Sequence, residues 1–136
     1  MAKAIKLRTD GHVDIIDVPQ QRSLLSWFYT QIGCSCIENV YPRGLQEPYM
    51  MVVDEEGLLK DDPVINFLGS YLYETQEHGH PIVGTALVMQ RVLTYDGPDI
   101  GGIPDQEAQK LAFAIGQKLP FAIQAINKKM GDRIRR

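Results

Sequence analysis

Two stretches decide the fold: residues 50–60, Met-Met-Val-Val-Asp-Glu-Glu-Gly-Leu-Leu-Lys, and residues 81–89, Pro-Ile-Val-Gly-Thr-Ala-Leu-Val-Met. Each contains a continuous apolar run, which is typical of a strand buried on both faces. Residues 54–57, Asp-Glu-Glu-Gly, have the composition of a solvated turn, because acidic side chains favour water and glycine tolerates positive φ. These stretches predict two buried strands separated by a turn and a helical segment.

The N-terminal region predicts a hairpin. Apolar and polar side chains alternate over residues 3–8 and again, less strictly, over residues 12–18. Asp10-Gly11 separates the two runs, and Asp-Gly between alternating runs is the strongest short-range hairpin signal. We therefore expect two antiparallel strands joined by a tight turn.

The period then changes over residues 20–32, where Leu24, Phe28 and Ile32 are spaced by four. This spacing predicts an amphipathic helix, and Gly33 stands where a C-terminal cap is expected. Residues 34–41 are predicted as the next strand, followed by a polar loop at residues 42–48.

Four further predictions concern the second half of the chain. Asp62-Pro63 is expected to open a helix, since Asp suits the N-cap and Pro the first helical position. Residues 74–80 are expected to form a polar loop, and residues 82–92 a strand rich in β-branched side chains. Residues 97–104, which contain three glycines, are expected to form an irregular loop.

The longest helical pattern lies at residues 105–129. Its apolar positions form one stripe, composed of Ala108, Leu111, Ile115, Leu119, Ala122 and Ile126. Pro120 lies inside this pattern, and an internal proline removes a backbone donor, so we expect a kink or two shorter helices. The stripe is long for such a chain, and we expect it to help build a homo-oligomer, most simply a dimer.

Together these patterns predict one α+β domain over residues 1–136, with a mostly antiparallel sheet of about five strands, packed helices and a kinked C-terminal helix. The chain has 136 residues, of which 44% are hydrophobic and 23% charged, which is ordinary for a globular protein. No apolar run approaches the ~20 residues of a membrane span. The N-terminus lacks the apolar core of a signal peptide, so a cytoplasmic location is expected.

Charge is distributed unevenly along the chain. Five basic side chains and Asp132 give residues 128–136 a net charge of +4. The formal net charge of the whole chain is −3, so residues 1–127 carry a net charge of −7. An acidic body is a poor partner for nucleic-acid phosphates, and no nucleic-acid role is expected. The basic tail either complements a helix dipole in solvent or contacts an acidic partner.

No catalytic residues are predicted. His78 and His80 could present two imidazoles to one ion, with Cys34 and Cys36 completing the set, but the spacing matches no zinc signature. The alternative interpretation is two exposed histidines in a polar loop and two small residues of a strand. No metal and no cofactor are therefore predicted, and an enzyme is the less favoured class.

The predicted ligand-binding residues are Tyr41, Arg43, Gln46 and Tyr49. They cluster around one loop at the ends of two strands, where ligands commonly bind. An arginine can fork onto a carboxylate or phosphate, and a tyrosine can stack or donate a hydrogen bond. The alternative interpretation is that the two tyrosines close the edge of the core.

The chain resembles a family of small bacteriophage and mobile-element proteins, domain of unknown function 3846. The resemblance covers roughly residues 3–110 and is carried by the Asp-Gly hairpin, the strand at residues 37–40, and residues 52–60 and 82–88. Cys34-Ser35-Cys36 departs from the family pattern of a glycine and an aromatic residue, and the helical extension at residues 111–136 is longer than usual.

The resemblance implies no activity and no catalytic residues. It implies the context of a phage or mobile element in a bacterial cytoplasm, where small proteins often counter host defences. The leading hypothesis is a non-catalytic protein that sequesters a small, nucleotide-like anion.

Two alternatives stay open. One is an interaction module that inhibits a host protein through its C-terminal helix. The other is a metal-dependent enzyme using His78, His80, Cys34 and Cys36.

Overall fold

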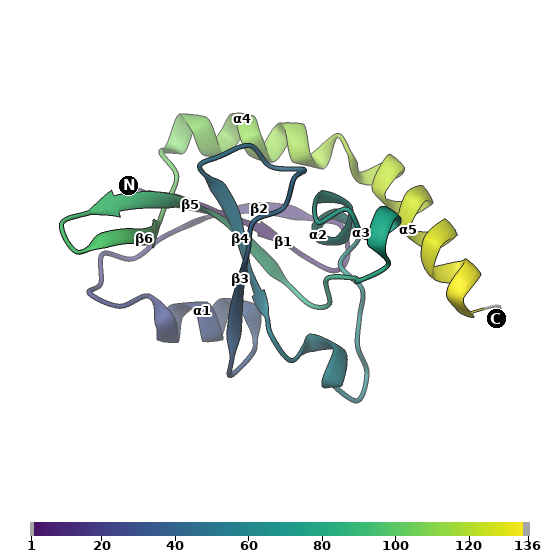
Figure 1. Ribbon diagram of the computed structural model, residues 1–136. Coiled ribbons are helices and arrows are strands. Elements are labelled where there is room, and N and C mark those ends of the chain that lie inside the picture. The colour runs from purple at the N-terminus through teal and green to yellow at the C-terminus, as the bar shows by residue number, and fades with distance from the viewer. Residues whose placement is uncertain (1, 135–136) are drawn as a thin grey trace.

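The computed structural model describes residues 2–134, which form a six-stranded antiparallel sheet with helices on both faces (Figure 1). The strands are β1 (Lys3–Leu7), β2 (Val13–Asp17), β3 (Ile37–Val40), β4 (Tyr49–Asp54), β5 (Ala86–Thr94) and β6 (Gly97–Gly101). The helices are α1 (Leu25–Ile32), α2 (Phe67–Leu72), α3 (Thr75–His78), α4 (Asp105–Gly116) and α5 (Leu119–Ile134), and the 3₁₀ turn η1 spans Gly57–Leu59. The fold is therefore α+β, as predicted.

The sheet is organised around β5, its longest strand. The strand order is β2-β1-β5-β4-β3, and β6 pairs with the outer half of β5. The inner half of β5 lies between β1 and β4, with Val88 opposite both Ile5 and Met51. The β5–β6 hairpin thus extends beyond the other strands at one end of the sheet (Figure 1).

Alternate side chains of the central strands enter two separate cores. Ala86 and Val88 of β5 pack with α2, α4 and α5, whereas Leu87 and Met89 pack on the opposite face, beneath α1. β4 divides its methionines and valines in the same way, which confirms that it is buried on both faces. Figure 1 shows α4 and α1 on opposite sides of the sheet.

The predicted N-terminal hairpin is confirmed. β1 and β2 pair antiparallel along their full lengths, from Lys3 opposite Asp17 to Leu7 opposite Val13. Gly11 adopts a φ of +91°, which few side-chain-bearing residues tolerate. The cap at Gly33 is also confirmed, with a φ of +77° and its N–H donating to the carbonyl oxygen of Tyr29. The helix before it is shorter than predicted and begins at Leu25.

A buried asparagine joins three parts of the fold. Asn66 has no exposed surface, and its Oδ1 accepts a hydrogen bond of 2.9 Å from the N–H of Gly69 at the start of α2. Its Nδ2 donates to the carbonyl oxygens of Leu7, at 2.8 Å, and of Gly84, at 2.9 Å. One side chain therefore caps α2 and attaches it to the end of β1 and to the segment that leads into β5.

The predicted helix start at Asp62-Pro63 is wrong. Both residues are exposed and lie in a loop, and α2 begins at Phe67, after its cap Asn66. Asn66 is the better cap because its amide also donates two hydrogen bonds that an aspartate cannot donate.

Three predictions of local structure are also corrected. Cys34 and Cys36 precede β3, which begins at Ile37, because the chain is still leaving the Gly33 cap at that point. Residues 74–80 contain the one-turn helix α3. Residues 97–101 form β6, since Tyr95 and Asp96 make a two-residue hairpin turn before Gly97, whose φ is positive, and this raises the strand count to six.

The C-terminal pattern forms two helices, one of the two outcomes expected from Pro120. α4 ends at Gly116, and Pro120 is the second residue of α5, in the first turn, where its missing N–H breaks no helical hydrogen bond. The stripe faces inward: Ala108, Ile115, Ala122 and Ile126 are buried, and Leu111 and Leu119 pack against the same core. The stripe therefore packs within the chain and does not form an exposed surface for a second copy. The homo-oligomer stays a prediction, and the stripe no longer supports it.

Replacement of Asn66 by alanine is expected to lower the free energy of unfolding by about 3 kcal/mol, because it removes a cap and the donor to one buried and one partly buried carbonyl. Urea denaturation followed by circular dichroism measures the change. Asn39→Ala, at an exposed position, is the matched control and should change stability by less than about 0.5 kcal/mol. Equal stability of the two variants would contradict the role given to Asn66.

Candidate functional site

The loop at residues 41–48 joins β3 to β4 and docks on the end of α2. Gly44 makes this approach possible: its N–H donates to the carbonyl oxygen of Leu72 at 3.1 Å. A Cβ at Gly44 would lie 2.6 Å from that oxygen, which is a steric clash. The absence of a side chain at this position therefore fixes where the loop sits.

The four predicted ligand-binding residues lie in or beside this loop, but they are not equivalent. Tyr41, Arg43 and Gln46 are exposed, whereas Tyr49 is half-buried at the start of β4. The Tyr49 hydroxyl donates to Oε2 of Glu107 in α4 at 3.2 Å. Burial, together with this hydrogen bond, raises the pKa of Tyr49. Tyr49 therefore fastens α4 to the sheet as a neutral donor.

Tyr41 has a partner that the sequence did not reveal. The guanidinium carbon of Arg91, in β5, lies 5.5 Å from the centre of the Tyr41 ring, within the range of a cation–π interaction. Arg91 follows the buried residue Met89 on the same face of β5 and is exposed. In the sequence, the only indication of a functional role for Arg91 is its position as a charged residue at the outer end of an apolar strand.

A shallow hollow lies next to this pair. It has a volume of about 270 Å³ and is lined by Glu47, Pro48, Arg91, Val92, Leu93 and Pro98. Leu93 and Pro98 are opposite one another in the β5–β6 hairpin. We call the set Tyr41, Pro48, Arg91, Leu93 and Pro98 the Arg91 surface, which combines one cation, one aromatic ring and apolar walls, with the exposed carboxylate of Glu47 at its border.

Both ring nitrogens of His78 make local hydrogen bonds, and the His80 ring stacks on the His78 ring. Nε2 of His78 lies 2.7 Å from the carbonyl oxygen of Tyr73, and Nδ1 accepts from the backbone N–H of His80 at 3.1 Å. These contacts place a proton on Nε2 and occupy both ring nitrogens of His78. Among the described side chains, those of residues 2–131, no group of three or more His, Cys, Asp or Glu could hold a metal ion.

The Cys34 thiol is not activated as a nucleophile. Cys34 and Cys36 are free and half-buried. Burial raises the pKa of the Cys34 thiol, with the Asp54 carboxylate adding to the effect, and a raised pKa disfavours the reactive thiolate.

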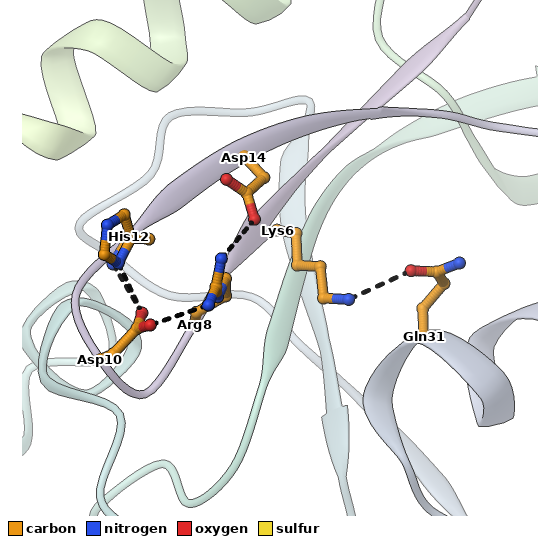
Figure 2. A network of polar contacts seen from close by, with 6 residues as sticks. All are labelled: Lys6, Arg8, Asp10, His12, Asp14 and Gln31. Carbon is orange, nitrogen blue, oxygen red and sulfur yellow. Dashed lines mark hydrogen bonds and ion pairs between the residues drawn. The ribbon is translucent and has the colours of Figure 1, made fainter.

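The third histidine, His12, belongs to a polar network at the β1–β2 turn (Figure 2). Arg8 bridges the carboxylates of Asp10 and Asp14 at 2.9 and 3.4 Å, and His12 Nδ1 lies 3.0 Å from Asp10. Figure 2 also shows Lys6 reaching from β1 to Gln31 of α1, a distance of 3.3 Å. The contacts among Arg8, Asp10, His12 and Asp14 are exposed and order the turn, whereas the Lys6–Gln31 contact is partly buried.

Comparison with known proteins shows the family. The profile of the family described as Domain of unknown function (DUF3846) matches residues 2–114, and the chain belongs to that family. The match ends within α4, so α5 lies beyond it. No curated protein and no solved structure matches the chain. Among the described residues, no helix combines the length and apolar character needed to cross a membrane.

The pKa of the Asp10 carboxyl is expected to lie below its ordinary value, chiefly because it accepts a hydrogen bond from the backbone N–H of His12. This carboxylate therefore stabilises the turn above the pKa of the unfolded chain, and the contribution is lost as the pH falls through the lower folded value. Carboxyl NMR titration measures it. His12→Ala should retain most of the shift, since the backbone donor remains, and a return to the ordinary value would contradict this assignment.

Proposed function

We propose that this protein is a non-catalytic binding protein that captures a small anionic ligand on the Arg91 surface. The observation that carries the proposal is the position of the Arg91 guanidinium over the Tyr41 ring, beside a hollow with apolar walls. Arg43 lies in the same loop as Tyr41, so a second cation is close by in the chain.

The chemistry of this surface suits a nucleotide-like anion. A guanidinium can donate two parallel hydrogen bonds to a phosphate or carboxylate. The Tyr41 side chain is 58% exposed and can stack on a planar ring. Pro48, Leu93 and Pro98 give the hollow apolar walls, as is typical of small-molecule sites. The proposed site therefore adds Arg91 to the predicted ligand-binding residues. Tyr49 supports the site from the side, by holding α4 through its hydrogen bond to Glu107.

A second candidate function is capture of a protein partner. Leu93 and Tyr95 are 87% and fully exposed at the projecting end of the β5–β6 hairpin, next to Arg91. Tyrosine and arginine are the residues most enriched in binding hot spots. The alternative partner site on the C-terminal helix is supported by Phe121, which is 63% exposed on α5, outside the family match. A role against host defence, in a phage or mobile element, is proposed from the family resemblance alone.

Arg91→Ala is expected to weaken binding of an anionic ligand about tenfold or more, because a charged hydrogen bond contributes about 1.5–3 kcal/mol. Native mass spectrometry of the intact chain purified from a bacterial lysate comes first, to detect a retained small molecule. Isothermal titration with ATP, cyclic diadenylate and inorganic phosphate then gives the affinities.

Arg43→Ala should lose less affinity than Arg91→Ala, and Lys110→Ala, an exposed cation of α4, is the control that should lose none. The ligand proposal would be overturned if native mass spectrometry detected the protein mass alone and titration with each of the three anions gave no heat of binding. That result would favour the protein partner. Equal losses in all three variants would show that only net charge matters.

A further inference from the structure

β3 is an open edge of the sheet. It pairs with β4 alone, and Cys36 preceding it accepts a hydrogen bond from the N–H of Glu55. Hydrogen-bonded pairs alternate along an antiparallel ladder, so Glu38 and Val40 bond to β4. The backbone groups of Ile37 and Asn39 point away from β4, and they have no hydrogen-bond partner among the described residues. These groups can receive another strand.

An acidic hollow adjoins this edge on the side of the sheet that α2 covers. It has a volume of about 250 Å³, and Glu38 and Val40 line it on the β3 side. Its floor includes the buried residues Val53 and Ile82, and its other polar walls are Asp54, Glu55, Tyr73 and His80. Asp54 is paired with Lys60 at 2.7 Å, whereas Glu38 and Glu55 are exposed and have no ion-pair partner among the side chains of residues 2–131. This hollow suits a basic side chain.

A second hollow reaches β3 from the opposite face. It has a volume of about 400 Å³ and includes Ile37 of β3. Its walls are mixed: Leu24, Leu25, Phe28 and Ile100 join Ile37 as apolar residues, and the polar residues are Gln21, Arg22, Ser23 and Asp99. This hollow suits an apolar side chain.

We propose that β3 receives an extended segment of a partner protein in which basic and apolar side chains alternate. Successive side chains of a strand point to opposite faces, so such a segment would direct its basic residues to the Glu38 hollow and its apolar residues to the Ile37 hollow. Backbone hydrogen bonds to Ile37 and Asn39 would supply affinity, and the two hollows would supply specificity. This site is separate from the Arg91 surface and does not depend on the proposed function.

Charge selects this occupant over a second copy of the chain. The body of the protein carries a net charge of −7 outside residues 128–136, which favours association with a basic segment. A second copy would bring its own Glu38 to the same four-residue edge, and like charges close together across two strands are destabilising.

The test uses the full chain and a fluorescein-labelled eight-residue peptide of alternating lysine and valine, with binding measured by fluorescence polarisation. Binding of this peptide, and none of an alternating glutamate–valine peptide, is expected. Glu38→Lys should weaken binding about tenfold or more, whereas Glu77→Lys, an equal change of charge at an exposed residue of α3 that lines neither hollow, should weaken it far less. Equal effects of the two variants, or no binding to the wild-type chain, would overturn the proposal.

Two further measurements separate strand pairing from attraction by charge alone. Asn39→Pro removes an N–H that makes no bond within the sheet, so the fold should persist, as circular dichroism would verify, and binding should be lost. A lysine–valine peptide N-methylated at every residue should also fail to bind, because it has no N–H left to donate to β3. Undiminished binding of the methylated peptide would overturn the proposal, as would a dimer of the wild-type chain that Asn39→Pro dissociates.

Discussion

The buried side chain of Asn66 is the constraint on which the arrangement of this fold depends. It is hydrogen-bonded to α2, to the end of β1 and to Gly84. It therefore fixes where the segment between β4 and β5 packs against the sheet. A buried amide is costly unless its partners are in place, which makes this junction specific. α2 in turn receives the 41–48 loop at Leu72, so the loop that carries Tyr41 and Arg43 is positioned through the same junction.

The parts of the fold that depend on local chemistry could be predicted from the sequence. Asp10-Gly11 and the apolar runs at β4 and β5 each determine their structure with neighbouring residues alone. Asp62-Pro63 was misleading because the competing cap, Asn66, gains from carbonyl oxygens of Leu7 and Gly84 that are distant in the sequence. β6 was missed because glycines and Pro98 disrupt its alternation, although an Asp-Gly dipeptide, as in the first hairpin, lies at its turn.

The same distinction applies to the candidate site. Its loop could be located from Tyr41 and Arg43, because a polar break between two strands is a local feature. The distinct roles of its residues could not be predicted, since Glu107 engages Tyr49 from 58 residues away and Arg91 approaches Tyr41 from another strand. The open edge at β3 likewise exists only because the strand order leaves that strand at the end of the sheet. Membership of a family without a described activity leaves these surfaces as the chemical evidence for function.

Hydrogen exchange of the Asn66 side-chain amide, observed by NMR on the ¹⁵N-labelled chain, tests the central claim most directly. If Asn66 joins α2 to β1 and to Gly84, its two Nδ2 protons should exchange as slowly as the backbone amide of Leu87 in the core of β5, because both require extensive unfolding. The exposed side-chain amide of Asn39 provides the fast reference in the same spectrum. Exchange of the Asn66 protons at the rate of Asn39 would contradict the account.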